Sequence, residues 1–179
     1  PKKAAARAVE SLLAARGLEP GGVARLVAPG YGRARVEGAD RKVTEITCHA
    51  RGAEFLQPGA DMVIDIGGQD SKVIKTDGAG AVVDFTMNDK CAAGTGRFLE
   101  VMAGALQTRV EELGELARGA QPVEITSMCT VFAESEVISL LAQDVPYEQV
   151  VAGIHRSVAR RVAAMAQRLG LGRRILFTG

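Results

Sequence analysis

Two cysteines stand where the sequence predicts the start of a helix. Cys91 lies in the stretch NDKCAAGTG and Cys129 in the stretch TSMCTVFAE, each followed by apolar residues at helical spacing. The amides at a helix start carry partial positive charge, which lowers the pKa of a nearby thiol and stabilises an anionic cluster. Both cysteines are therefore candidate metal ligands, although a lone cysteine is at least as often buried and inert.

A third stretch, DIGGQD, reads as a phosphate-binding turn after a short apolar strand. Gly67 and Gly68 lack a Cβ, so their amides can approach an anion closely. We expect Asp65 to hold Mg²⁺ through water, and Gln69 and Asp70 to orient a water for attack on phosphorus. The stretch lacks the Gly-Lys-Ser/Thr of a Walker loop, and the alternative is a plain tight turn between two strands.

The remaining cysteine, Cys48, falls inside a predicted helix, where we favour a core position. The neighbouring His49 is interpreted as a hydrogen-bonded residue rather than a ligand. A zinc site built from Cys48, His49, Cys91 and Cys129 is an alternative, but it lacks paired C-x-x-C spacing. A [4Fe–4S] cluster normally takes four thiolates, so Cys91 and Cys129 would need two more from a second subunit.

The bulk composition describes an ordinary small protein. The 179 residues suit one domain or two small lobes, and 47% of them are hydrophobic. A net charge of +1 gives no reason to expect nucleic acid or a membrane surface as partner. No apolar run approaches the ~18 residues of a membrane span, and the amino end does not resemble a signal peptide. With three cysteines, we expect a cytoplasmic protein whose thiols stay reduced.

Hydrophobic periodicity predicts an α/β order of elements. Helices are predicted over 3–16, 43–56, 94–107, 131–142 and 147–169. Strands are predicted over 23–28, 62–66, 72–75, 81–85, 123–126 and 175–177, with a hairpin turn at 76–80. The clearest helix, 147–169, has apolar residues every three or four positions and keeps its arginines mostly off that stripe. Both ends of the chain look cut, and we place a boundary near 58–61.

The chain resembles the BadF/BadG/BcrA/BcrD ATPase family, whose members activate 2-hydroxyacyl-CoA dehydratases or serve as ATP-hydrolysing subunits of benzoyl-CoA reductases. The resemblance covers nearly the whole chain. It rests on the passages 30–33 with 44–52, 65–72, 88–100 and 129–139, and more weakly on 152–155. The two passages that contain Cys91 and Cys129 are the most specific.

This resemblance implies the fold of actin, Hsp70 chaperones and sugar kinases, with ATP between two ribonuclease-H-like lobes. Residues 1–60 would be the remainder of the first lobe, and 61–179 most of the second. Cys91 and Cys129 would ligate one [4Fe–4S] cluster shared between two subunits. The implied nucleotide residues are those of the phosphate turn (Asp65, Gly67, Gly68, Gln69, Asp70), with Gly94, Thr95 and Gly96 between nucleotide and cluster.

The implied activity couples ATP hydrolysis with Mg²⁺ to the delivery of one low-potential electron. The acceptor would be a CoA-thioester dehydratase, and the donor a ferredoxin or flavodoxin. The second subunit would be another copy or a paralogue. The alternatives are an ATPase subunit of a benzoyl-CoA reductase, a kinase of the same fold without a cluster, a chaperone-like ATPase without metal and a zinc-stabilised binding module. The family's first Asp-x-Gly-Ser/Thr loop and its Gly-Gly-Val adenosine segment are not in this sequence, so we expect weak ATP binding by this chain.

Overall fold

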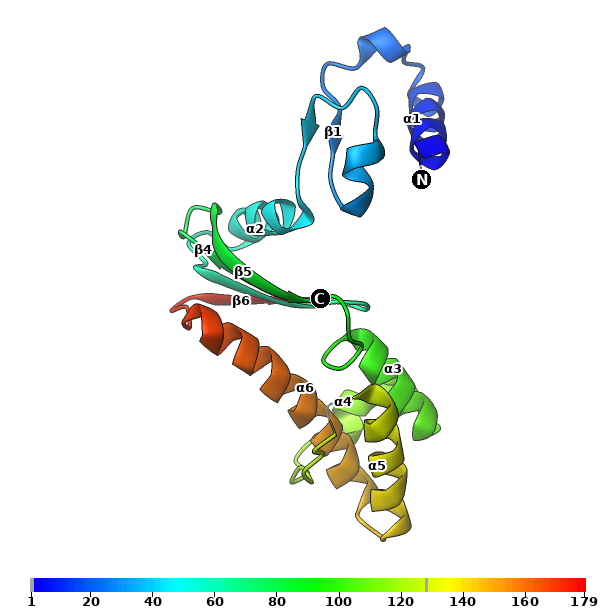
Figure 1. Cartoon of the computed structure of the whole chain (residues 1–179), viewed down its shortest axis with the longest axis vertical. Coiled ribbons are helices and arrows are strands. Elements are labelled where there is room, and N and C mark those ends of the chain that lie inside the picture. Colours follow the sequence, from blue (N-terminus) through cyan, green and yellow to red (C-terminus); the bar gives the residue numbers. More distant parts are fainter. Residues whose placement is uncertain (1, 128) are drawn as a thin grey trace.

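The structure, a computed structural model, describes residues 2–127 and 129–179 and confirms the predicted α/β class (Figure 1). The helices are α1 (Lys2–Arg16), α2 (Glu45–Leu56), α3 (Gly96–Ala105), α4 (Leu113–Leu116), α5 (Thr130–Ala142) and α6 (Tyr147–Leu169). The strands are β1 (Val27–Ala28), β2 (Arg41–Lys42), β3 (Met62–Ile66), β4 (Ser71–Thr76), β5 (Val82–Asn88) and β6 (Ile175–Thr178). Short 3₁₀ turns cover Pro20–Gly22, Tyr31–Arg35 and Val110–Glu112.

The main sheet has the strand order β5-β4-β3-β6. Strands β3, β4 and β5 form an antiparallel meander, so the predicted hairpin is confirmed. Strand β6 returns parallel to β3, which requires a long crossover, and helices α3 to α6 provide it. In the β3–β4 register Asp65 faces Lys72, a pairing that matters for the site.

Helices cover both faces of this sheet. Alternate residues of a strand point to opposite faces, so neighbouring positions such as Met62 and Val63 enter different cores. Val63 and Ile74 pack with α2, whereas Met62 and Val73 pack with α6. Figure 1 shows α2 and α6 on opposite sides of the sheet. The sheet is thereby held from both sides, and the turn at the end of β3 is fixed to a rigid base.

A second layer of helices packs beyond one end of the sheet. Its core joins buried residues of α3, α5 and α6, among them Phe98, Met102, Val137 and Ile154. Figure 1 shows α3 and α5 side by side, with the start of each nearer the sheet. The segments that carry the two candidate cysteines therefore enter this layer from the same end. Within the described residues, no helix has both the length and the apolar character needed to cross a membrane.

The amino-terminal segment departs from the prediction. A buried strand over 23–28 is wrong, because only Val27–Ala28 pairs, parallel to Arg41–Lys42, and Val27 is half exposed. Among the described residues no larger sheet lies alongside to bury it, and Figure 1 shows β1 and α1 standing apart from the main sheet. The division of the chain at residue 60 stays a prediction. Helix α2, which precedes that point, packs on the main sheet.

The predicted strand over 123–126 is also wrong. Its backbone amides have other partners, since the Val123 amide donates to the Gln149 carbonyl at 3.1 Å and the Thr126 amide donates to the Glu136 carboxylate at 2.9 Å. Gly153 of α6 lets this segment approach closely, because a Cβ there would lie 2.6 Å from the Val123 carbonyl oxygen. The apolar pattern correctly predicts that Ile125 is buried, but the segment that carries Ile125 is not a strand.

The core between the sheet and α6 sets much of the stability. Met62 is fully buried there, so Met62→Ala should lower the free energy of unfolding by about 2–5 kcal/mol through lost contacts and a residual cavity. Val83→Ala on the exposed side of β5 should cost less than about 1 kcal/mol. Urea unfolding measures both, and equal losses would contradict this placement of the core.

Candidate functional site

The stretch DIGGQD forms a tight turn between β3 and β4, as the sequence predicts. The Gly67 amide donates to the Asp70 carbonyl at 2.9 Å and closes the turn. A Cβ on Gly67 would lie 3.1 Å from both the carbonyl oxygen and Oδ1 of Asp70, so a larger residue would crowd it. Gly68 and Gln69 are exposed at the tip of the turn, where a ligand can reach them.

Below this tip, Asp65 is held at the end of β3. Its side chain is only 8% exposed, and Oδ1 accepts a hydrogen bond from Thr178 Oγ1 at 2.9 Å. His49 Nε2 and Thr178 Oγ1 are also 2.9 Å apart, so His49 is hydrogen-bonded as expected and lies 3.6 Å from Asp65 Oδ1. The turn thus brings Asp65 and Asp70 together around a polar, largely enclosed point.

The cation at this point is Lys72, which sequence reasoning did not single out. Its Nζ donates to Asp65 Oδ2 at 3.2 Å and to Asp70 Oδ1 at 2.5 Å. Burial lowers the pKa of Lys72, but the hydrogen bonds to Asp70 and Asp65 outweigh it, so the pKa is raised and the ammonium stays charged. The available signal was the cross-strand register, since Lys72 must face Asp65 once the turn length is known.

The start of α3 is hydrogen-bonded to this turn. The Gly96 amide donates to the Gly67 carbonyl at 2.9 Å, and the Arg97 amide donates to the Gly68 carbonyl at 2.8 Å. A Cβ on Gly96 would lie 3.0 Å from Gly68 Cα, so glycine permits this approach. These two amides therefore bind the turn, and stabilisation of a cluster by the start of this helix stays a prediction.

The loop that carries Cys91 is ordered by polar contacts on both sides. Asn88 Nδ2 donates to the carbonyls of Cys91 and Ala93, each at 2.9 Å. Ser71, the residue after the turn, donates from Oγ to the Gly94 carbonyl at 2.5 Å. Gly94 has a φ of +85°, which favours glycine, and α3 begins at Gly96 rather than at Gly94. Cys91 is half-buried against the helical core.

Cys129 is the N-cap of α5 and is exposed. The segment before it is held by Glu136 of the same helix, whose carboxylate accepts from the amides of Thr126 and Ser127 at 2.9 and 2.8 Å. Burial raises the pKa of Glu136, but the hydrogen bonds from Ser127 and Thr126 outweigh it and the pKa is lowered. The hydroxyl of Thr130, next to Cys129, is buried and has no hydrogen-bond partner among the described residues.

The described thiols are free cysteines: Cys48 and Cys129 are exposed and Cys91 is half-buried. Among the described residues, no three of the His, Cys, Asp and Glu side chains are grouped to hold a metal. A zinc site from Cys48, His49, Cys91 and Cys129 is therefore not formed. The core position expected for Cys48 is wrong as well: it is exposed, because α2 buries Ile46, Ala50 and Ala53 on the opposite side of the helix.

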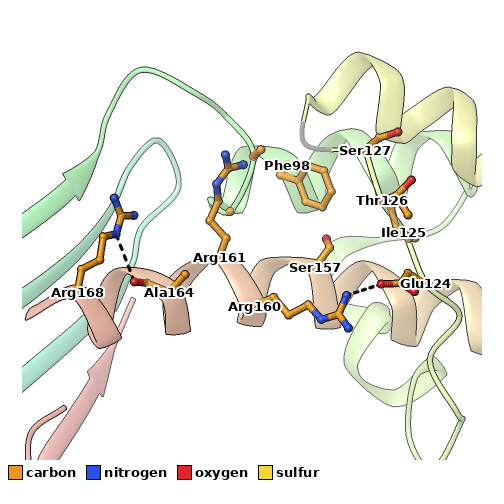
Figure 2. Close-up of a pocket in the computed structure, with 12 residues that line it drawn as sticks. Phe98, Glu124, Ile125, Thr126, Ser127, Ser157, Arg160, Arg161, Ala164 and Arg168 are labelled. Carbon is orange, nitrogen blue, oxygen red and sulfur yellow. Dashed lines mark hydrogen bonds and ion pairs between the residues drawn. The ribbon is translucent and has the colours of Figure 1, made fainter. Parts of the chain in front are cut away.

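A cavity of about 480 Å³ opens beside the Cys91 loop (Figure 2). Its lining residues come from the start of α3, the segment 124–127 and α6, and they include Gly94, Phe98, Ser157, Arg160, Arg161 and Arg168. Arg160 Nη1 is paired with Glu124 Oε1 at 2.8 Å, and Arg161 packs so closely on Gly94 that a Cβ there would lie 2.6 Å from its Cδ. Planar guanidinium groups bind anions and stack on aromatic rings. From the sequence, these arginines could be recognised only as residues off the apolar stripe.

The comparisons with known proteins agree with one another. The model of the BadF/BadG/BcrA/BcrD ATPase family matches residues 1–179. The 2-hydroxyisocaproyl-CoA dehydratase activator of Clostridioides difficile is 48% identical over 174 residues, covering 97% of this chain and 65% of the relative. A benzoyl-CoA reductase subunit of Thauera aromatica is 34% identical over 171 residues, covering 95% of this chain and 60% of the relative.

A solved structure shows the same fold. It is the activator of the 2-hydroxyisocaproyl-CoA dehydratase from Clostridium difficile with bound ADPNP, with a TM-score of 0.78 at 48% identity. The match covers 97% of this chain and 66% of that one. The chain thus spans about two thirds of the length of the relatives it matches.

The contact between α3 and the turn can be tested with two glycines of one helix. Gly96→Ala should lower the free energy of unfolding by about 1–3 kcal/mol, because its Cβ would meet the Gly68 backbone. Gly104→Ala has open space and should stabilise the chain by about 0.5–1 kcal/mol through helix propensity. Urea unfolding compares them, and a neutral Gly96→Ala would rule out the close approach.

The Glu136 contact predicts a pH dependence. Glu136→Gln should cost about 1 kcal/mol at neutral pH, because the ionised carboxylate accepts the Thr126 and Ser127 amide hydrogen bonds in a partly exposed place. Since the folded-state pKa is below its ordinary value of 4.5, this stability is present above that value and is lost as the pH falls through the folded-state pKa. Unfolding measured from pH 7 to pH 3 should show the variant converging on the wild type. Glu134→Gln, on the same helix but outside these contacts, is the control, and a constant gap across that range would refute the interpretation.

Proposed function

Because the chain belongs to the BadF/BadG/BcrA/BcrD ATPase family, we propose that it acts in an ATP-dependent activator of a 2-hydroxyacyl-CoA dehydratase. In this proposal ATP hydrolysis drives one low-potential electron to a partner enzyme that acts on a CoA thioester. The support is 48% identity to an activator of that kind over nearly the whole chain. The electron donor would be a small low-potential protein of the ferredoxin or flavodoxin type.

One observation carries the proposal: hydrogen bonds join the phosphate turn to the start of α3 and to the Cys91 loop. The carbonyls of Gly67 and Gly68 accept from the amides that begin α3, and Ser71 anchors the Gly94 carbonyl. A phosphate group that moves the turn must therefore move the start of α3 with it. Such a shared rigid contact is the kind of element through which two sites influence each other.

The nucleotide would lie along this contact. Its phosphates would meet the exposed tip of the turn at Gly68 and Gln69, with the Gly94–Gly96 segment alongside. This placement is supported by continuity, because the Gly94 carbonyl is bonded to Ser71, the residue that follows the turn.

The residues around Asp65 fit a divalent cation. Two carboxylates already share one positive charge there, so the point attracts cations, and Asp65 is fixed by Thr178 rather than free to turn away. Mg²⁺ would neutralise phosphate charge when bound. In the proposal Asp65 holds it, while Gln69 and Asp70 orient the attacking water.

Cys91 and Cys129 would supply half of the ligands of a [4Fe–4S] cluster, and a second copy or a paralogous subunit the other half. The cluster would serve as the one-electron carrier. Exposure of Cys129 and of the neighbouring apolar Val131 and Phe132, which are 65% and 68% exposed, supports a partner surface at this point. The Thr130 hydroxyl, which is buried and has no partner within the described part of the chain, adds a donor that could face a cluster sulfur.

The second candidate function is the ATPase subunit of a benzoyl-CoA reductase. The same two cysteines and turn would serve it, within a hetero-complex. Sequence favours the dehydratase activator, because identity falls from 48% to 34% between the two relatives. A kinase of the same fold without a cluster is a more distant alternative and predicts a protein that binds no iron.

Anaerobic reconstitution with iron and sulfide tests the proposal. Wild-type chain should take up about four irons per two chains, because one cluster needs four thiolates. Cys91→Ser and Cys129→Ser should each lose most of the iron and the brown absorbance. Cys48→Ser is the matched control and should keep both, since Cys48 lies on α2 away from the helical layer. An iron-free wild type, or full loading of Cys129→Ser, would count decisively against the cluster.

A further inference from the structure

Lys72 is a buried lysine bonded to two carboxylates at the proposed cation site. It is 8% exposed overall, and its Nζ touches Asp65 Oδ2 and Asp70 Oδ1. The Asp65 and Asp70 side chains are themselves only 8% and 22% exposed. A buried charge needs a partner, and here one ammonium serves two anions. The group therefore keeps a net negative charge in the absence of any bound cation.

The position of Lys72 follows from the sheet. Lys72 and Asp65 are direct partners across the β3–β4 ladder, and Asp70 lies two residues earlier at the end of the turn. Direct cross-strand partners have their Cβ atoms about 5 Å apart. The strand register therefore places the Lys72 ammonium beside the two carboxylates. Lys75, on the same strand, instead reaches the Leu169 carbonyl at 2.9 Å. The contact with the acidic pair thus belongs to one lysine of the strand.

We propose that Lys72 is a positioning residue that stands in for a divalent cation: its ammonium holds the Asp65 and Asp70 carboxylates together and competes with a metal ion for them. Without Lys72, the two carboxylates would repel each other across a poorly solvated gap. With it, they keep one arrangement before any nucleotide arrives. The same ammonium lowers the affinity of the pair for a free divalent ion, so that the ion is held mainly when phosphate oxygens add to the ligands.

This inference rests on the proposed role of Asp65 as the residue that holds Mg²⁺. It adds that the metal affinity of the empty site is set by a residue that is not itself a ligand. The functional consequence is that the site binds a free divalent ion only weakly. Metal is then held mainly together with nucleotide. The backbone of Lys72 is held in place, because β4 lies between β3 and β5 in the sheet.

Binding of Mn²⁺, followed by electron paramagnetic resonance on the whole chain without nucleotide, tests the competition. Lys72→Met should bind Mn²⁺ about tenfold or more tightly than wild type, since a like charge within ~4 Å has been removed. Lys72→Arg keeps the charge and should stay within about threefold of wild type. Lys75→Met is the matched control and should leave Mn²⁺ binding unchanged. Equal, weaker or absent Mn²⁺ binding by folded Lys72→Met would overturn the inference.

A second measurement covers the case in which Lys72→Met does not fold. In wild-type chain, Mg²⁺ titration followed by NMR of the lysine Cε and Nζ groups should shift the Lys72 signals and leave those of Lys75 in place. Lys72 signals that do not shift at saturating Mg²⁺ would contradict the proposed competition between the ammonium and the metal ion. Neither measurement involves iron, so failure of the cluster and failure of this inference are distinguishable.

Discussion

The rest of the site depends on two backbone hydrogen bonds, from the amides of Gly96 and Arg97 to the carbonyls of Gly67 and Gly68. The first amides of every helix have no partner within the helix. Here the carbonyls of the turn, and not water, accept hydrogen bonds from two of these amides. Because Gly96 has no side chain, the helix can approach the turn backbone to contact distance. Through this contact the proposed phosphate site and the Cys91 loop become one packed unit.

The remaining elements hold that unit in place. The sheet fixes the turn, since β3 is a central strand covered by α2 on one face and α6 on the other. The helical core packs α3 against α5, so a movement of the Cys91 segment would carry the Cys129 segment with it. Glu136 then holds the segment before Cys129 in place, because its carboxylate accepts hydrogen bonds from two amides of that segment. Movement at the turn would therefore be shared by both cysteines, which is what the proposed coupling of nucleotide to cluster requires.

Local signals predicted much of the fold. Helix α6 has the predicted bounds, and β3, β4 and β5 lie where alternation and the hairpin turn placed them. The failures share a cause, because each depends on a distant partner. The segment at 123–126 gives its amides to α6 and Glu136, and the strand expected at 23–28 finds no larger sheet to join among the described residues. In the candidate site, the glycine and cysteine motifs could be recognised from the sequence. The position of Lys72 follows only from the strand register, and the arginine-lined cavity only from the packing of the helices.

Amide hydrogen exchange of Gly67, Gly96 and Arg97 by NMR tests the central claim most directly. If the turn and the helix start form one unit, these three amides should be protected to a similar degree and should lose protection together as urea is added below the unfolding midpoint. Gly96 and Arg97 amides that exchange as fast as exposed loop amides, while Gly67 stays protected, would show that the turn and the helix are independent and would contradict the account.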